Sequence, residues 1–324
     1  MKPVRSYISG TGSYLPANIV TNADLAERVD TSDEWIFART GIRQRHIADD
    51  NQSTSDLAEQ AARRALDDAG LTPADIDLII VATTTPTHAF PSVATGIQHR
   101  LGAPVCPAFD VQAVCAGFAY AIDIADKYIQ SGSIKNALVI GAECMSKILN
   151  WDDRNTCVLF GDGAGAVVLS PRDDHEGIIA SKLFADGQYK ELLWVPNGTS
   201  WKKSDEPTDD CLQMKGSEVF KTAVSQLRGL VGEVLNSTDY QAEDIDKLVP
   251  HQANIRIIKS VADKLNMPME KVVTTVDKHA NTSAASIPLA LDVAAKSQQI
   301  QRGDLIFLEA FGGGFTWGGQ LIRF

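Results

Sequence analysis

The chain has 324 residues, of which 44% are hydrophobic and 22% charged, and its formal net charge is -11. These values are typical of globular proteins with a full core, and they exclude disordered and fibrous chains. The acidic balance argues against general nucleic-acid binding. No apolar run approaches the roughly 18 residues that span a bilayer, and the first ten residues lack the apolar stretch of a secretory signal. We therefore expect a cytoplasmic protein that does not bind membranes.

Helical and strand-like patterns alternate along the chain. Apolar residues near i, i+3, i+4 and i+7 predict helices over 55–70, 117–129 and 217–235. Buried, β-branched runs predict strands within 73–83 and 131–141, and over 108–111, 246–249, 272–276 and 305–308. Strands buried on both faces between helices predict mainly parallel sheets.

Two of these turn-and-strand patterns occur twice. The pattern that starts at Pro73 returns 169 residues later at Ala242, and the one at 131–141 returns at 300–310. The shared period predicts two similar α/β halves, 1–174 and 175–324, packed together. The alternative is coincidence between common strand patterns, which two matches at one period disfavour. Residues 186–210 have no counterpart in the first half and are predicted to cross the surface.

One of the five cysteines stands at a position suited to chemistry. The cysteines show no CxxC spacing, so neither a disulfide framework nor a zinc site is indicated, and buried packing is the default role. Cys115, however, follows the strand 108–111 and opens the helix 117–129. Unpaired N–H groups and the dipole at a helix start favour a thiolate, and the neighbouring residues are small. Acyl transfer is the natural use of such a group.

Two residues of the second half are expected to meet Cys115. The period places the Cys115 loop opposite the segment that begins at Asn281, and His251 stands at the C-terminal end of the strand 246–249, where chemistry collects in parallel sheets. Taken alone, His251 would be structural and Asn281 a turn residue. Together they offer an imidazole and an amide that can donate hydrogen bonds to an oxyanion. The glycine run at 312–314 allows close backbone approach, or a tight strand connection.

Eight segments resemble one known family. They closely resemble the β-ketoacyl-[acyl carrier protein] synthase III family, the initiating condensing enzymes of bacterial type II fatty-acid synthesis in the thiolase superfamily. The matching segments, in chain order, are 31–36, 39–43, 87–92, 114–118, 160–166, 250–254, 281–286 and 309–318. The resemblance implies a five-layered αβαβα fold, a homodimer, acetyl-CoA or a similar acyl-CoA primer, malonyl-[acyl carrier protein] as extender, and neither cofactor nor metal.

The resemblance also implies roles for individual residues. Cys115, His251 and Asn281 match the family's triad: the cysteine carries the acyl group, while the other two hold the malonyl thioester oxygen as CO₂ leaves. The backbone N–H groups of Cys115 and Gly313 would form the oxyanion hole. The residues matched to substrate binding are Trp35 and Arg154 for adenine, Arg39 for phosphate, Gly216, Phe220 and Asn254 for pantetheine, and Phe90 for closing the acyl pocket across the dimer interface.

The carrier protein is acidic, and the resemblance matches Lys221, Arg256 and Lys264 to its docking patch. Three positions depart from the family's pattern: Asp263 stands where some relatives have a lysine, and Ala280 and Asn155 where glycine is common. These departures bear on the docking patch, the loop before Asn281 and the adenine clamp. His279, a spare histidine near the site, is expected to be structural.

Other reaction classes remain as alternatives. A superfamily member with the same triad could use a different acyl acceptor. A thiolase would need a second cysteine near 312–318, and elongating synthases use two histidines. The order Cys, His, Asn also occurs in papain-like hydrolases, although the sequence around Cys115 lacks their local signature. A non-enzymatic binding protein on this scaffold would be expected to lose part of the triad.

Overall fold

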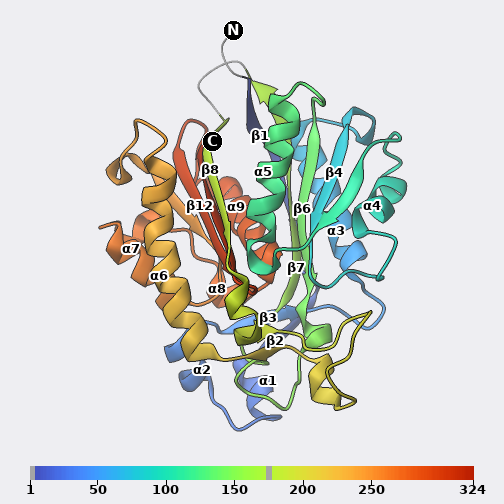
Figure 1. Ribbon diagram of the computed structural model, residues 1–324, viewed down its shortest axis with the longest axis vertical. Helices are drawn as coiled ribbons and strands as arrows, with labels where there is room; N and C mark the ends of the chain where they lie inside the picture. The colour runs from blue at the N-terminus through green and yellow to red at the C-terminus, as the bar shows by residue number, and fades with distance from the viewer. Residues whose placement is uncertain (1–3, 173–176) are drawn as a thin grey trace.

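Two β-sheets and three layers of helices alternate through the molecule, as Figure 1 shows from right to left. The computed structural model describes residues 4–172 and 177–324. Helices α3 and α4 cover the outer face of the first sheet, α5 and α9 lie between the sheets, and α6 and α7 cover the second sheet. The layer helices are α3 (Thr54–Ala69), α4 (Val93–Leu101), α5 (Gly117–Gln130), α9 (Ser286–Lys296), α6 (Gly216–Leu235) and α7 (Ile255–Lys264). This is the predicted αβαβα order.

The two sheets repeat one strand order. The first is β1-β7-β6-β4-β5 and the second, read in the same sense, is β8-β13-β12-β11. The strands of the first sheet are β1 (Arg5–Tyr14), β7 (Asp162–Arg172), β6 (Ala137–Cys144), β4 (Leu78–Ala82) and β5 (Ala108–Val111). Those of the second are β8 (Gly177–Ala185), β13 (Thr316–Arg323), β12 (Leu305–Gly312) and β11 (Lys247–Pro250). The predicted boundary at 174 and 175 lies outside the described residues.

The prediction of mainly parallel sheets is wrong. Strand β4 pairs in parallel with β5 and β6, and β11 does so with β12. The pairs β1–β7, β6–β7, β12–β13 and β13–β8 are antiparallel. Strands β6 and β12 are each followed by a return strand with no crossover helix between them, and such a return gives an antiparallel neighbour. The sheets are therefore mixed.

The predicted strand 272–276 is also wrong. Only Val272 pairs, through an isolated parallel bridge to Leu248. A short 3₁₀ turn, Met269–Lys271, precedes it, and helix α8 (Val276–His279) takes the end of the predicted strand. The second sheet thus lacks a full counterpart of β5, although its β-branched sequence resembles one.

The middle helices pack closely against both sheets. Helix α5 contacts β4 and β6 on one side and β12 and β13 on the other, and Phe118 and Ile122 are fully buried. Helix α9 approaches the first sheet so closely that a Cβ on Gly141 would stand 2.3 Å from the Ala284 oxygen, and one on Gly165 would stand 2.5 Å from the Leu289 nitrogen. Glycine is required at both positions, and the start of α9 is held against the first sheet.

The part of the chain that connects β1 to α3 forms a small lobe, at the bottom of Figure 1. Its elements are β2 (Asn18–Thr21), α1 (Asn22–Ala26), α2 (Asp33–Thr40) and β3 (Gln44–Ile47). Arg45, on β3, is fully buried, and its guanidinium donates to the Val158 oxygen at 2.8 Å and the Asn22 Oδ1 at 2.9 Å. Burial lowers the pKa of Arg45 to about 10. The buried arginine ties the lobe to the chain before β7.

The segment predicted to cross the surface, 186–210, is mostly exposed or half-buried, and only Pro196 and Asp209 in it are buried. It contains β9 (Leu193–Trp194), which pairs with β10 (Gln213–Met214) just beyond the segment, and 3₁₀ turns at Gly187–Leu192 and Pro207–Asp210. Periodicity over two-residue strands is too short to detect, which explains why the sequence suggested a loop.

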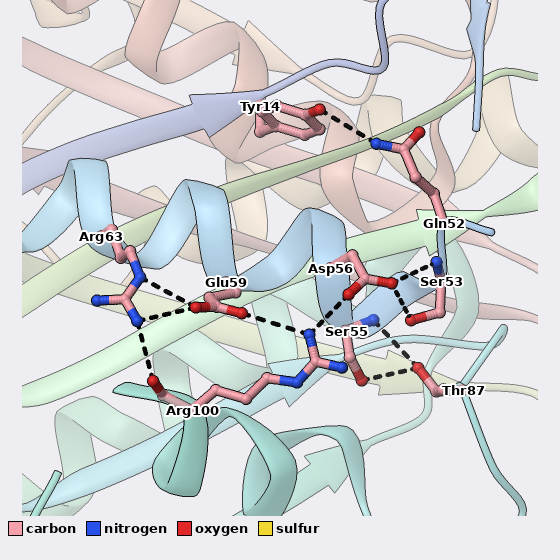
Figure 2. Close-up of polar contacts among 9 residues, drawn as sticks. All are labelled: Tyr14, Gln52, Ser53, Ser55, Asp56, Glu59, Arg63, Thr87 and Arg100. Carbon is pink, nitrogen blue, oxygen red and sulfur yellow. Dashed lines mark hydrogen bonds and ion pairs between the residues drawn. The ribbon is translucent and has the colours of Figure 1, made fainter. Parts of the chain in front are cut away.

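The start of α3 anchors the loop before α4, as Figure 2 shows. Ser53 and Asp56 form a capping box, and the Arg100 guanidinium reaches the Asp56 carboxylate at 2.7 Å. The Ser55 and Thr87 hydroxyls lie 2.7 Å apart. The remaining contacts of the cluster join Arg63 and Arg100 with Glu59, Arg63 with the Arg100 backbone oxygen, and Gln52 with Tyr14. The Ser55–Thr87 bond holds the loop before α4 on the outer helix layer. In the parts of the chain that the structure describes, no helix has the length and apolarity to cross a bilayer.

Candidate active site

A cavity lies between the second sheet and helices α6 and α7. Its walls come from β11, β12, both helices and the β9–β10 pair. Cys115, His251 and Asn281 all line it, although they lie far apart in the sequence. Three more of the residues matched to substrate binding line it too, namely Gly216, Phe220 and Asn254.

Cys115 lies in a strained turn before α5. The turn is the 3₁₀ segment Val114–Ala116, and Val114 has a φ of 49°, a left-handed conformation that β-branched residues rarely adopt. Cys115 is 4% exposed, and burial raises the pKa of its thiol to about 12, against a smaller opposite effect of Ser283. This is opposite to the direction expected from a helix start, because desolvation outweighs the dipole. The resting thiol is therefore protonated.

The second half repeats this turn. The 3₁₀ segment Ser283–Ala285 precedes α9, and Ser283 has a φ of 50°. Ser283 follows Val114 by 169 residues, the same spacing as between Pro73 and Ala242. One turn carries Cys115, and the other begins two residues after Asn281.

Asn281 is held by its backbone and by one end of its side chain. Its N–H donates to the Leu159 oxygen at 2.9 Å, and its oxygen accepts the Gly161 N–H at 3.0 Å. The side-chain Oδ1 accepts the Ser283 N–H at 2.9 Å. Because Oδ1 is bonded within the loop, the opposite end of the planar amide, the NH₂ group, serves as the donor for a ligand.

His251 is buried and neutral. Its backbone N–H donates to the Glu309 oxygen at 2.8 Å, and its Nδ1 lies 2.5 Å from the Ser286 Oγ. The Ser286 oxygen already accepts the Gln252 N–H at 3.3 Å, so its own O–H can donate to Nδ1 and leave the ring proton on Nε2. Burial lowers the pKa of His251 to about 3. The ring is therefore suited to donate a hydrogen bond as a neutral group.

The glycine-rich turn between β12 and β13 lies against the Cys115 turn. A Cβ on Gly312 would stand 2.6 Å from the Cys115 nitrogen, so no larger residue fits there. The Thr316 hydroxyl donates to the Ala113 oxygen at 2.7 Å and joins the two turns. Gly313 is buried beneath β9, where a Cβ would stand 2.8 Å from the Leu193 oxygen.

The residues matched to adenine and phosphate cluster around one ring, outside the residues that line the cavity. The Arg39 guanidinium lies 4.3 Å and that of Arg154 5.2 Å from the centre of the Trp35 ring. Arg154 also donates to the Asp30 backbone oxygen at 2.6 Å. A base stacked between Trp35 and Arg154 would need them further apart, so such binding requires Arg154 to move.

Asn254 links two elements at the cavity wall. Its Oδ1 accepts the Arg256 N–H at 2.8 Å as the cap of α7, and its Nδ2 donates to the Arg39 oxygen at 3.0 Å. Arg256 lies 5.5 Å from the ring of Phe220, which also lines the cavity. Both donor and acceptor of the Asn254 amide are thus engaged in holding α7 on α2.

The remaining predicted residues lie at the surface. Phe90 is 86% exposed and does not line the described cavity. Lys221 on α6, and Arg256 and Lys264 on α7, are exposed, and so is Asp263 beside Lys264. The three cations lie on the two helices that form the outer wall of the cavity.

The structure shows the surroundings of the other two departures, Ala280 and Asn155, and of the spare histidine, His279. Ala280 has a φ of 57° and a ψ of −158°, a conformation that favours glycine. The Asn155 side chain donates to Asp153 Oδ1 at 2.9 Å. His279 is buried and lies outside the described cavity wall, and burial lowers its pKa to about 4.

Sequence reasoning missed three residues that bear on the site. Ser286 contacts His251, Leu193 lines the cavity from the supposed surface segment, and Glu309 lines it from β12. For Glu309 a signal existed: it is the single charge in the apolar run 305–312. Among the described residues, no cluster of three or more His, Cys, Asp or Glu side chains could hold a metal ion.

Known proteins share this fold and sequence over the full length. Residues 109–187 match the family described as 3-Oxoacyl-[acyl-carrier-protein (ACP)] synthase III, and residues 235–324 match its C-terminal part. A β-ketoacyl-[acyl-carrier-protein] synthase III of Xanthomonas oryzae is 55% identical over 100% of this chain and 99% of its own. The corresponding protein of Thioalkalivibrio sulfidiphilus is 57% identical over 98% of each chain.

Solved structures agree. A 3-oxoacyl-[acyl-carrier-protein] synthase III of Aquifex aeolicus superimposes with a TM-score of 0.93 at 49% identity, covering 98% of this chain and 100% of that one. The enzyme of Pseudomonas aeruginosa gives a TM-score of 0.93 at 41% identity, covering 99% and 98%. The fold is thus the thiolase-like fold of these enzymes. The chain belongs to the β-ketoacyl-[acyl-carrier-protein] synthase III family of condensing acyltransferases.

Proposed function

We propose that this enzyme condenses a short acyl-CoA, acetyl-CoA in the first instance, with malonyl-[acyl carrier protein] through an acyl-Cys115 intermediate. The products are a 3-ketoacyl-[acyl carrier protein], CoA and CO₂. The observation that carries the proposal is the cavity lined jointly by Cys115, His251 and Asn281. A thiol that lines a mainly apolar cavity suits acyl transfer, and two neutral donors that line the same cavity suit an enolate.

The first step is loading of Cys115. The sulfur attacks the acyl-CoA carbonyl, the C–S bond to CoA breaks, and the thiol proton ends on the CoA sulfur. Because the thiol is protonated at rest, its proton must leave as the new bond forms. The Cys115 and Gly313 N–H groups are assigned to the carbonyl oxygen, since the glycine turn packs directly on the Cys115 backbone.

The second step is decarboxylation and condensation. The His251 Nε2–H and the Asn281 NH₂ donate to the malonyl thioester oxygen while the bond to CO₂ breaks, and the resulting enolate attacks the acyl carbon. Neutral donors suit this role because neither supplies an acidic proton that would quench the enolate. The Ser286 contact favours the imidazole tautomer that the step needs.

Substrate binding follows the same assignment. Trp35, Arg39 and Arg154 would take the CoA adenine and phosphate, and Lys221, Arg256 and Lys264 would take the acidic carrier. A homodimer would bring Phe90 of one protomer to the acyl pocket of the other, which accounts for an exposed aromatic ring in the single chain. We place the enzyme in the cytoplasm, at the initiation of fatty-acid synthesis.

The loading step is tested by intact-mass measurement after mixing with acetyl-CoA. We expect a mass increase of one acetyl group, absent in Cys115→Ser. Cys144→Ser is the matched control, because Cys144 is also buried and does not line the described cavity. Acetylation that survives in Cys115→Ser would contradict the proposal.

The second step is tested with His251→Ala and Asn281→Ala. Both variants should still acetylate Cys115, while CO₂ release from malonyl-[acyl carrier protein] falls by about 10²- to 10³-fold, the usual effect of losing an oxyanion donor. Loss of acetylation together with intact CO₂ release would reject this division of labour.

A further inference from the structure

A carboxyl group lines the cavity on an otherwise apolar face. In β12 the side chains alternate between two sides: Ile306, Leu308 and Ala310 pack in the cluster of the middle helices. On the other side, Leu305, Phe307 and Phe311 pack in the cluster of α6 and α7. Glu309 occupies this second face, lines the cavity and is 1% exposed.

The Glu309 carboxyl has no protein partner within the described residues. Both side-chain oxygens are buried and make no hydrogen bond. A buried polar group without a partner costs stability, so its presence on an apolar face points to a ligand or a reaction step. The neighbouring cavity residues on α6 and α7, including Ala223, Leu227 and Ile258, are apolar and cannot supply the missing bond.

Glu309 lies close to both halves of the chemistry. Its backbone oxygen accepts the His251 N–H, and it pairs in register with Pro250 at the end of β11. Cys115 lines the same cavity, from the turn against which Gly312 of this strand packs. The carboxyl and the sulfur are therefore two walls of one cavity.

The condensation needs a proton at the sulfur. When the enolate attacks acyl-Cys115, the C–S bond breaks and the electron pair stays on Sγ. Burial raises the pKa of the Cys115 thiol to about 12, so a bare thiolate is a poor leaving group in this cavity. One proton is consumed per condensation, because the malonyl carboxylate enters charged and CO₂ leaves neutral.

Few groups in the cavity could supply that proton. The titratable side chains among its described lining residues are Cys115, His251 and Glu309. Glu143 also acts on the Cys115 thiol, but it does not line the cavity, and its carboxylate accepts hydrogen bonds from the hydroxyls of three consecutive threonines, Thr83 to Thr85. Burial lowers the pKa of His251 to about 3, so the neutral ring has no acidic proton to give. Burial raises the pKa of Glu309 to about 8, so this carboxyl is largely protonated at neutral pH. A carboxyl with this pKa can protonate the Cys115 thiolate, which is far more basic than the carboxylate.

We propose that Glu309 is the general acid that protonates the Cys115 sulfur as the condensed product leaves. An oxygen of the carboxyl gives its proton to Sγ while the C–S bond breaks, and the carboxylate then regains a proton from water. The assignment rests on the proposed function, since it presumes an acyl-Cys115 intermediate. It adds Glu309 as a fourth reacting side chain to Cys115, His251 and Asn281.

Glu309→Gln removes the acidic proton and keeps the size of the side chain. We expect acetyl-Cys115 to form to the wild-type extent, and its consumption on adding malonyl-[acyl carrier protein] to slow by about 10²-fold, the lower end of general acid catalysis. CO₂ release should exceed ketoacyl product, because enolate that cannot condense is quenched by water. Consumption at the wild-type rate with one CO₂ per product would overturn the proposal.

The pH dependence gives a second test. In the wild type, consumption of preformed acetyl-Cys115 should fall as pH rises through about 8, because Glu309 loses its proton there. Glu309→Gln should lack this decline. Asp126→Asn is the control: Asp126 is fully buried but bonds Ser6 and Lys127 away from the cavity, and its variant should keep the decline. An unchanged decline in Glu309→Gln would refute the assignment.

Stability gives a test that does not depend on activity. The folded-state pKa of Glu309 is raised above the ordinary value of 4.5, so the folded protein holds this proton more tightly than the unfolded chain. Its contribution to stability therefore falls as pH rises from about 4.5 to 8. As pH rises across that window, the free energy of unfolding of Glu309→Gln should increase relative to that of the wild type. A constant difference between the two would contradict a buried, protonated carboxyl.

The two proposals fail separately. If no acyl-CoA adds mass to Cys115, the proposed function itself is wrong. If Cys115 is acylated and Glu309→Gln behaves as wild type in consumption and in pH dependence, only the role of Glu309 is rejected.

Discussion

Ala280 occupies a backbone conformation that glycine adopts freely. Its φ of 57° and ψ of −158° fall in a region that side chains with a Cβ rarely enter, and the residue is fully buried next to Asn281. Such strain costs on the order of 1–3 kcal/mol. The loop that carries Asn281 is therefore held in place by its surroundings, through bonds to Leu159 and Gly161.

Ala280→Gly should stabilise the enzyme. Relief of strain outweighs the extra chain entropy of glycine, about 0.5–1 kcal/mol, so we expect the free energy of unfolding to rise by about 1 kcal/mol. Chemical denaturation measures the change. Ala290→Gly is the control, because Ala290 lies inside helix α9 and the same exchange should destabilise there. A loss of stability in both variants would show that the Ala280 strain is absent in solution.

At the level of single residues, the sequence indicated which side chains line the candidate site better than it indicated their burial and their pKa values. Cys115, His251 and Asn281 were recognisable because each stands in a motif at a strand or helix end. The raised pKa of Cys115 was not, because it depends on burial by distant segments. Glu309 was passed over for the same reason: one charge in a strand indicates nothing about an unpartnered carboxyl until the facing helices are in place.

Among the elements, the long helices were predicted closely. The pattern over 217–235 corresponds to α6 (Gly216–Leu235), and the one over 55–70 to α3 (Thr54–Ala69). Strand direction was not predictable, because a continuous apolar run indicates burial on both faces and is silent on the neighbour's direction. The run 272–276 failed because α8 begins at its last residue.

Helices α6 and α7 carry the predicted docking cations. Arg256→Glu should raise the KM for malonyl-[acyl carrier protein] by about tenfold, more at low salt than at high salt, because a charge that attracts the carrier would repel it. Steady-state kinetics at two ionic strengths measure this. Lys135→Glu is the control, since Lys135 is exposed in the connection between α5 and β6. An equal rise in KM in both variants would mean that the change in net charge, and not the position of Arg256, causes the effect.

For the whole molecule, two exposed apolar side chains predict an interface. Phe90 is 86% exposed and Val105 fully so, and the bonds between Ser55 and Thr87 hold the Phe90 loop on α3. These are the two most exposed of the large apolar side chains among the described residues, and we take them as the candidate contact surface. A second copy of the chain is the proposed partner.

Phe90→Ser should weaken that association. We expect a dimer for the wild type in analytical ultracentrifugation, and a dissociation constant raised at least tenfold in the variant, because an anchoring ring is lost. Trp201→Ser, which removes another exposed aromatic ring, should leave the dimer intact. A monomeric wild type at micromolar concentration would exclude the dimer.

Helices α5 and α9 are enclosed between the two sheets, and this enclosure determines which parts of the enzyme can open locally. Both helices begin at the turns that carry or oppose the sulfur, and both are covered on two sides. The amide protons of their buried N-terminal turns can meet solvent only when the sheets separate, so these protons should exchange with deuterium as slowly as the protein unfolds globally. The β9–β10 pair, two residues long on each side, should exchange by local opening. We therefore expect the Cys115 side of the cavity to be rigid and the β9–β10 side, which covers Gly313, to provide the local opening that substrates need.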